Sequence, residues 1–208
     1  MGFSSKDLEI LQKRVQGKKS AKSSQPASNE IDPIDVSFKD CVILGVDPSL
    51  RSAGYGIIHY KNKEAKALAY GIITPPVHWT RGKRLAFLSA GLREQIEKHS
   101  PTICAIEGLF YAQNLKTALI MGEARGACLA QIAAQDLTIY EIAPRRVKLA
   151  MVGYGGAGKS AVAKMTQRML RLDEEPVPDA ADALGLALTL ALEKSGAHLN
   201  AGDGIKLL

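Results

Sequence analysis

Cysteine and histidine are scarce in this chain of 208 residues. The three cysteines stand at positions 41, 104 and 128 and the four histidines at 59, 78, 99 and 198, scattered along the sequence. Disulfide-stabilised secreted domains usually carry even cysteine counts, and zinc sites need ligands at close spacing. We therefore expect neither a disulfide framework nor a zinc site, and we interpret the cysteines as buried thiols in a reducing compartment.

Long apolar runs are missing as well. No stretch approaches the roughly 20 apolar residues that a membrane-spanning helix needs. Lys6, Asp7 and Glu9 occupy the positions where a secretory signal would have its apolar stretch. The sequence thus predicts a protein without a membrane partner, located in the cytoplasm.

The charge of the chain is only mildly unbalanced. Lysine and arginine outnumber aspartate and glutamate by 27 to 21, a formal net charge of +6. A basic surplus of this size permits binding to a polyanion such as DNA but does not require it, because it also keeps a protein in solution. The chain is long enough for one full-sized hydrophobic core and short for two.

The first 40 residues differ from the rest. Residues 17–33, GKKSAKSSQPASNEIDP, are polar and interrupted by proline, a composition that cannot bury enough apolar surface to stay ordered. We expect residues 1–40 to be a disordered basic and polar extension, either without further role or acting as an arm on DNA phosphates. One compact domain is predicted for 41–196, followed by a flexible tail at 197–208.

Hydrophobic periodicity predicts an α/β fold. Short apolar runs rich in β-branched residues alternate with segments whose apolar residues recur at helical spacing. Tight connections between the first three runs predict an antiparallel meander. The order βββαβαβ followed by helices implies a five-stranded mixed sheet flanked by helices on both faces. The expected strands are 41–47, 54–60, 66–75, 102–108 and 137–142, and the expected helices are 80–98, 114–134, one starting at Pro144, 159–171 and 179–194.

Two acidic residues follow buried strands directly. Asp47 ends the run CVILGVD, and Glu107 has the same place at the end of the fourth expected strand. A single carboxylate of this kind can simply cap the turn after its strand. Two of them on separate buried strands are harder to explain as caps and indicate a functional site at the strand ends.

A second acidic pair opens the last expected helix. Asp179 and Asp182 are three residues apart, so they lie on one helix face, one turn from each other. Taken alone, the pair is most simply explained by Asp179 as an N-cap and Asp182 as a residue favoured by the helix dipole. The helix continues as ALGLALTLAL, which is apolar almost all round. We therefore expect it to pack into the core with its acidic end inward.

Four converging carboxylates would need a counter-charge. At about 4 Å and an effective dielectric of about 20, each like-charged pair costs about 4 kcal/mol. Proteins keep such clusters when a divalent cation neutralises them, and oxygen ligands favour Mg²⁺ or Mn²⁺ over zinc. Two ions sharing one aspartate can activate a water and stabilise the leaving oxygen of a phosphodiester. The pattern predicts catalytic and metal-binding roles for Asp47, Glu107, Asp179 and Asp182.

Three motifs, in their order and spacing, resemble those of the RuvC family of crossover (Holliday) junction endodeoxyribonucleases. They are ILGVDPSLRSAGYGII, AIEGLFYAQNLKTALIMGEARGACL and PDAADALGLAL, and together they span about residues 42–194. The resemblance implies an RNase H-like fold, a homodimer, and paired incisions across a four-way DNA junction that leave 5′-phosphate nicks. It also implies two Mg²⁺ per active site, with Mn²⁺ as a possible substitute, and a branch-migration helicase as partner.

The resemblance extends to further residues. The four carboxylates fall where the family has its metal-binding catalytic groups. Lys148 and Lys159 fall on its basic residues that contact DNA, and Phe110 falls on the aromatic placed at the junction crossover, although a core aromatic after a strand explains Phe110 as well. We expect Arg145 and Arg146 to guide the junction by its phosphates.

One residue departs from the family pattern. Ser49 stands at the glycine position of the usual Asp-Pro-Gly, where a turn with positive φ would be strained.

A junction-binding relative without catalysis is a further alternative, but retention of all four carboxylates argues against it.

A nucleotide-binding loop is the strongest competing interpretation. Residues 153–160, GYGGAGKS, match the P-loop pattern, which would place Lys159 on phosphates and Ser160 on Mg²⁺. That motif needs a preceding strand, whereas Pro144 suits a helix start, and no later apolar strand ends in an aspartate for the second Mg²⁺ contact. We interpret the loop as one that brings Lys159 close to a DNA phosphate. Sugar kinases and actin-like ATPases open with a similar strand and turn, but they usually need two such domains and a longer chain.

Overall fold

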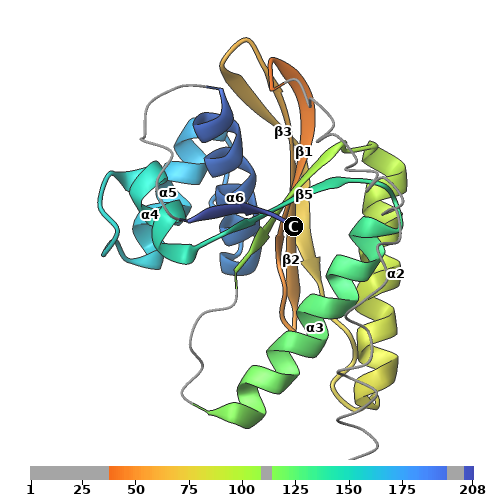
Figure 1. Cartoon of the computed structure of the whole chain (residues 1–208). Coiled ribbons are helices and arrows are strands. Elements are labelled where there is room, and N and C mark those ends of the chain that lie inside the picture. Colours follow the sequence, from red (N-terminus) through yellow and green to blue (C-terminus); the bar gives the residue numbers. More distant parts are fainter. Residues whose placement is uncertain (1–37, 109–113, 196–203) are drawn as a thin grey trace, which may run out of the picture. The chain divides into compact units, whose positions relative to one another are not determined.

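The computed structural model describes residues 38–108, 114–195 and 204–208, all within the second of the two units, 1–34 and 35–208, into which the chain divides. This unit contains both strands and helices (Figure 1). In chain order they are β1 (Asp40–Asp47), β2 (Ala53–Lys61), β3 (Glu64–Ile73), α2 (Arg81–His99), β4 (Ile103–Glu107), α3 (Leu115–Ala133), β5 (Thr138–Ile142), α4 (Pro144–Val152), α5 (Lys159–Leu170), α6 (Pro178–Lys194) and β6 (Ile205–Leu207).

The strands form one mixed sheet in the order β3-β2-β1-β4-β5-β6. The first three make the predicted antiparallel meander, and β1, β4 and β5 run parallel to one another. Because parallel strands end at the same edge, the carboxyl ends of β1 and β4 lie side by side. The α/β class and the mixed sheet predicted from the sequence are confirmed.

The sixth strand was not predicted. Residues 205–207 fall in the segment expected to be a flexible tail, yet they pair antiparallel with β5, where Glu141 faces Lys206. The Ala143 N–H also donates to the Gly204 carbonyl oxygen at 2.8 Å. The expectation of a tail was therefore wrong for these residues, since a three-residue strand is too short to show a period-2 pattern and is stabilised only by its neighbour.

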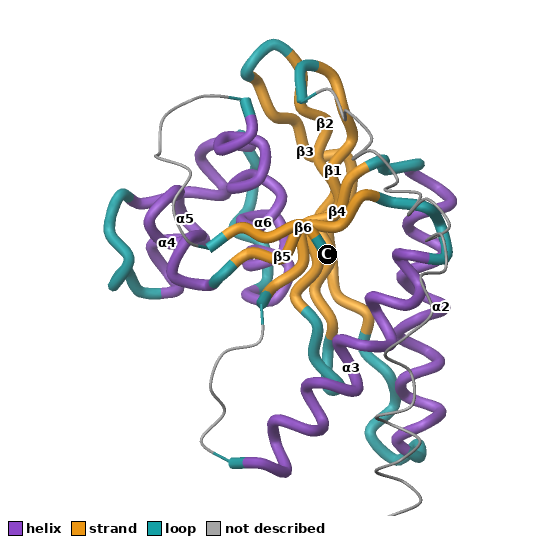
Figure 2. Tube along the Cα trace, in the orientation of Figure 1, coloured by secondary structure: helices purple, strands orange, loops and turns teal. Residues whose placement is uncertain are grey.

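Helices cover both faces of the sheet, as the sequence predicts (Figure 2). One face carries α4, α5 and α6, and the other carries α2 and α3, which also pack against each other. Each face has its own hydrophobic core, the first built around α6 and the second around α2 and α3. None of the helices in the described ranges is both long enough and apolar enough to cross a bilayer.

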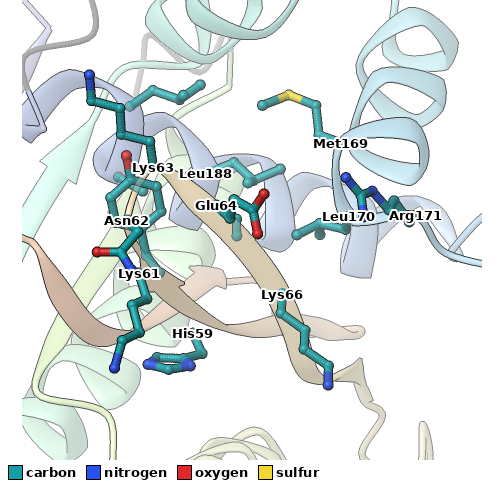
Figure 3. A pocket seen from close by; sticks show the side chains of 14 residues that line it. His59, Lys61, Asn62, Lys63, Glu64, Lys66, Met169, Leu170, Arg171 and Leu188 are labelled. Atoms are coloured by element: carbon teal, nitrogen blue, oxygen red, sulfur yellow. The ribbon is translucent and has the colours of Figure 1, made fainter.

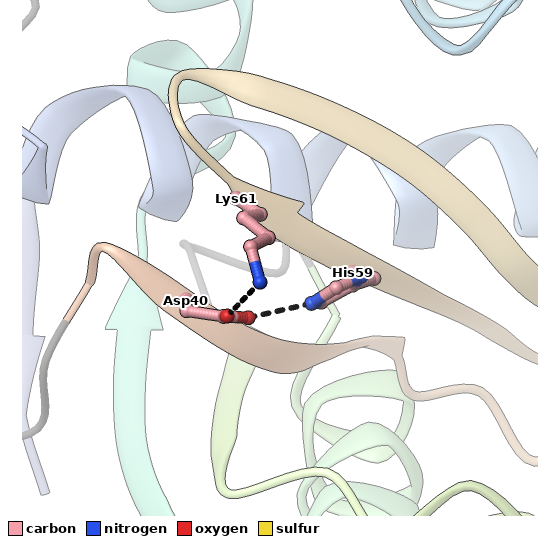
Figure 4. Close-up of polar contacts among 3 residues, drawn as sticks. All are labelled: Asp40, His59 and Lys61. Carbon is pink, nitrogen blue, oxygen red and sulfur yellow. Dashed lines mark hydrogen bonds and ion pairs between the residues drawn. The ribbon is translucent and has the colours of Figure 1, made fainter.

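A small ion-pair group lies at the end of the sheet where β1 begins (Figure 4). The Asp40 carboxylate lies 2.6 Å from the Lys61 Nζ and 2.7 Å from the His59 Nε2, across the β1–β2 pair. These two contacts lower the pKa of Asp40, the Lys61 contact most. Because all three side chains are exposed, the group contributes little stability. It marks the end of the sheet opposite to the one where β1 and β4 finish.

Candidate active site

The two predicted strand-end carboxylates lie on neighbouring strands. Val46 pairs with Ile106 in the parallel β1–β4 ladder, so Asp47 and Glu107 follow side by side at the end of the sheet. Both face α6, because alternation along a strand places them on the same side as Ile43 and Ala105 of the α6 core. Their carboxyl groups share a hydrogen bond. The two residues therefore form one pair of carboxyl groups rather than separate turn caps.

Helix α6 brings the other two carboxylates to the same place. Asp179 lies in its first turn and Asp182 follows one turn later, while the N-cap is Val177, so Asp179 does not cap the helix. Glycines on the sheet allow α6 to approach closely: a Cβ at Gly54 would lie 1.9 Å from the Asp179 carbonyl oxygen. Gly54 is the partner of Asp47 in the β1–β2 ladder. The helix start is thereby fixed next to the strand-end pair, with its apolar remainder buried as predicted.

The pKa of Asp47 is raised by burial and by the neighbouring carboxylates. Burial, followed by the charge of Glu107, raises that pKa from its ordinary value to about 8, and the charges of Asp182 and Asp179 add to the rise. Burial also raises the pKa of Glu107, with Asp182 acting in the same direction. All three of the other predicted carboxylates thus act on Asp47. Both rises in pKa favour one proton shared by the Asp47–Glu107 pair over two adjacent negative charges.

Lys159, one of the basic residues predicted from the sequence, is paired with this cluster. As the first residue of α5, it donates from Nζ to Asp182 Oδ2 at 3.0 Å, and this contact raises its pKa. Its side chain is 77% exposed and its partner 24% exposed. A cavity of about 400 Å³ opens between the starts of α5 and α6 and is lined by both residues. Lys159 can therefore meet an anion that enters beside the carboxylates.

The donor set fits hard divalent cations. All four groups are carboxylates, whose oxygens are the ligands that such cations prefer, and Asp47 lies in a partly buried place where the charges of the other three raise its pKa. Within the described ranges, no three acidic, histidine or cysteine side chains stand close enough together to hold one ion as they are. Asp47 is instead paired with Glu107, and Asp182 forms an ion pair with Lys159.

The other predicted DNA contacts differ in their surroundings. Arg145 is exposed and Lys148 half-buried on α4, which starts at the same end of the sheet as the carboxylates because β5 runs parallel to β4. Arg146 is buried instead, and its Nη2 lies 2.6 Å from Glu193 Oε2, within an ion pair whose side chains are 9% and 7% exposed. This placement contradicts a phosphate contact for Arg146, which joins α4 to α6. Phe110 lies outside the described residues.

The P-loop interpretation fails on local structure. The segment before the glycine-rich loop is helix α4, not a strand, and Pro144 opens it as expected. Gly153 ends that helix with a φ of 77°, and α5 then begins at Lys159. Since a P-loop joins a strand to a helix, the match is to the sequence pattern alone.

Two features of the site went beyond the sequence predictions. Arg125 of α3 donates from Nε to the Glu107 carbonyl oxygen at 3.1 Å and pairs with Glu141; the one signal for it is a charged residue in a helix otherwise rich in small and apolar side chains. Ser49 has no positive φ. The strain expected at this position is therefore absent, and its Oγ accepts from the Arg51 N–H at 3.3 Å.

A second cavity, of about 680 Å³, lies far from the carboxylates (Figure 3). It is lined by the β2–β3 hairpin, including Lys61, Lys63 and Lys66, and by residues near the end of α5, including Met169 and Arg171. The hairpin is at the opposite end of the sheet from Asp47, because Asp40 pairs with Lys61 and Asp47 with Gly54. This cavity is therefore separate from the candidate active site.

The sheet order, the helices on both faces and the carboxylates at the central strand ends define an RNase H-like fold. Residues 43–190 match the family model described as "Crossover junction endodeoxyribonuclease RuvC". The chain belongs to this family.

Similar proteins agree with this assignment. The crossover junction endodeoxyribonuclease RuvC of Albidiferax ferrireducens is 40% identical over 167 residues, which cover 78% of this chain and 91% of that protein. The RuvC of Heliobacterium modesticaldum is 42% identical over 151 residues, covering 72% and 93%.

Solved structures show the same fold. RuvC of T. thermophilus in complex with a Holliday junction substrate matches with a TM-score of 0.72 and 29% identity, covering 81% of this chain and 99% of that one. The yeast mitochondrial Holliday junction resolvase matches with a TM-score of 0.54 at 14% identity over 74% of this chain and 80% of that one, a likeness of fold alone.

Proposed function

We propose that this protein is a metal-dependent endonuclease that resolves four-way DNA junctions by paired, symmetric incisions in recombination and repair. The observation that carries the proposal is the convergence of four carboxylates from β1, β4 and α6 in a chain of the RuvC family. A four-way junction is the substrate because the T. thermophilus relative is described in complex with one. The cytoplasmic location expected from the sequence is part of this proposal.

The proposed cofactor is a pair of Mg²⁺ ions, with Mn²⁺ as a possible substitute, held by Asp47, Glu107, Asp179 and Asp182. Bound there, the ions would lower the pKa of an attacking water and stabilise the departing 3′ oxygen, leaving a 5′-phosphate. Loss of the Asp47 proton frees two adjacent carboxylates as ligands. The repulsion that raises the pKa of Asp47 is the same repulsion that a cation would relieve.

Basic residues around the cluster would position the DNA. Lys159 is largely exposed beside the cavity between α5 and α6, and once Asp182 is engaged elsewhere its ammonium is available to a phosphate oxygen. Arg145 and Lys148 extend a basic surface along α4. Contacts of this kind fix the register of the DNA backbone without reading its sequence.

The proposal includes a homodimer. Helix α3 presents a stripe made of Leu115, Leu119, Gly122 and Gly126, at helical spacing. Both leucines are exposed, at 75% and 60%, and a Cβ on either glycine would meet nothing within 4 Å. An exposed stripe of apolar and small residues allows two helices to pack closely. A branch-migration helicase remains an expected further partner.

The test is cleavage of a synthetic four-way junction with end-labelled strands. With Mg²⁺ we expect symmetric nicks that DNA ligase can seal, and with EDTA no cutting. Asp47→Asn should lower the cleavage rate by on the order of 10²-fold or more, while junction binding, followed by fluorescence anisotropy, changes by less than about threefold. Asp40→Asn, an exposed change on the same strand, is the matched control and should cut normally. A junction left intact by the wild type, or cut normally by Asp47→Asn, would contradict the proposal.

A further inference from the structure

Arg125 occupies an unusual position for a cation. Its side chain is only 12% exposed, on the α3 face of the sheet, and it contacts β4 and β5, two of the three parallel strands that end on the active-site side. Its Nε donates to the Glu107 carbonyl oxygen at the end of β4, at 3.1 Å, and its Nη2 donates to the Glu141 carboxylate on β5. A buried guanidinium is costly unless it is paired, and here its Nε and its Nη2 both donate hydrogen bonds.

The geometry separates Arg125 from the chemistry on the other face. The Glu107 side chain faces α6, whereas Arg125 reaches the same residue from the α3 side and touches only its backbone. Glu141 pairs with Ile106, whose side chain belongs to the core between the sheet and α3. Arg125 is also not among the charges that shift the pKa of Glu107. Its contact with Glu107 therefore runs through the backbone carbonyl oxygen.

The shape of arginine explains why this residue type suits the position. The Nε–H and Nη–H donors form a rigid planar fork, so one side chain can hold a carbonyl oxygen and a carboxylate at fixed separation. A lysine keeps the charge but has no fork. The strand end is also tied to β5 by the Gly108 N–H, which donates to the Ile142 carbonyl oxygen at 2.9 Å. Arg125 thus adds a second tie at the residue that carries the carboxylate.

We propose that Arg125 and Glu141 form a brace that fixes the end of β4 and so positions the Glu107 carboxylate for metal binding. Arg125 is a positioning residue in this inference, which rests on the proposed function of Glu107 as a metal ligand. Outer partners that orient metal ligands typically change metal affinity by about 10–100-fold when they are lost. The brace also links the active site to α3, the helix proposed to form the dimer.

The experiment compares Arg125→Lys, which keeps the charge, and Glu141→Gln, which keeps the size, with Arg81→Lys as matched control. Arg81 forms an exposed ion pair with Glu123 of α3 at 3.3 Å and does not touch Glu107. The first readout is Mn²⁺ binding to the free protein by calorimetry. We expect about tenfold weaker binding for the two brace variants and less than twofold change for Arg81→Lys.

A second readout follows the strand end without metal. Hydrogen exchange of the Gly108 amide should be about tenfold faster in Arg125→Lys, because its strand end opens more often. Unchanged Mn²⁺ affinity together with unchanged Gly108 exchange would overturn the brace, even if the wild type cuts junctions normally. Conversely, a wild type that binds Mn²⁺ but leaves the junction intact would overturn the proposed function, while the brace would still be judged by the Mn²⁺ titrations. A wild type that binds no Mn²⁺ would overturn both.

Discussion

At the scale of single residues, the surroundings of Asp47 oppose its ionisation. Burial and three neighbouring carboxylates raise its pKa from the ordinary 3.8 to about 8. An acid whose pKa is raised in the folded protein binds more protons there than in the unfolded chain, between about pH 4 and pH 8. The contribution of Asp47 to stability therefore falls as the pH rises through this window.

This sign leads to a prediction for the ion-free protein. In EDTA, Asp47→Asn should be more stable than the wild type, with a difference that grows from pH 4 to pH 8. One pKa unit is worth about 1.4 kcal/mol, so even half of the rise would give about 3 kcal/mol at pH 8. Urea unfolding of both proteins at pH 5 and pH 8 measures the difference. Parallel pH profiles for the two proteins would show that the four carboxylates do not crowd Asp47.

Two arginines, Arg146 and Arg125, lie in surroundings that their residue type alone does not predict. Arg146 was predicted to guide the junction by its phosphates, but it is buried against Glu193. Arg125 carried no prediction, yet it holds the backbone of Glu107. In the sequence, the charge and the local spacing of the two arginines do not distinguish an exposed side chain from a buried one. Only the packing of the helices decides which arginine faces solvent and which is paired inside.

At the scale of elements, the contact between α6 and the sheet decides the geometry of the site. Gly45 and Gly54 lack the Cβ atoms that would collide with the α6 backbone, at 1.8 Å from the Ala183 oxygen and 1.9 Å from the Asp179 oxygen. The distance between the helix and the sheet therefore depends on these two positions. It also sets the distance between Asp179 and Asp47, because Gly54 pairs with Asp47.

Gly54→Ala should accordingly push the start of α6 away from the sheet. We expect a loss of about 1–3 kcal/mol in unfolding free energy, as for other overpacked positions, and a fall in junction cleavage larger than the loss of folded protein explains. Gly82→Ala is the matched control: Gly82 lies in α2, and a Cβ there meets nothing within 4 Å. That change should stabilise the protein by about 0.5–1 kcal/mol. Urea unfolding and cleavage rates at equal folded concentration test both changes. A Gly54→Ala protein that is fully active and equally stable would show that the Cβ at position 54 does not displace α6.

At the scale of the whole molecule, paired incision requires two active sites. If two copies meet along the α3 stripe, Leu119→Glu places like charges in the interface and should shift the protein from dimer to monomer, with about tenfold or greater weakening of self-association. Analytical ultracentrifugation measures the change. Leu68→Glu, at a leucine 42% exposed on β3, is the control and should stay dimeric. A Leu119→Glu protein that remains a dimer would place the interface elsewhere.

Much of the fold follows from local sequence patterns. Short apolar runs and helical apolar patterns predicted the first five strands and the five helices in their order, because burial of a strand or of a helix face requires a regular apolar pattern in the sequence. Strand β6 left no such trace, because its three residues are stabilised by pairing with β5 and not by a pattern of their own. The sequence also predicted that Asp47, Glu107, Asp179 and Asp182 lie at strand and helix ends, since local sequence patterns show where a strand or a helix begins and ends.

The distances between those elements were decided only by the tertiary structure. It joins Asp47 to Glu107 through the pairing of β1 with β4. It also pairs Lys159 with Asp182 and withdraws Arg146 from the surface, because these contacts depend on how α4, α5 and α6 pack together. The sequence by itself determined the class of fold, and it pointed to the carboxylates that we propose carry the chemistry. The packing of α6 on glycines and the brace from α3 determined how those residues face one another, because contacts between distant segments are set by the shapes of both partners.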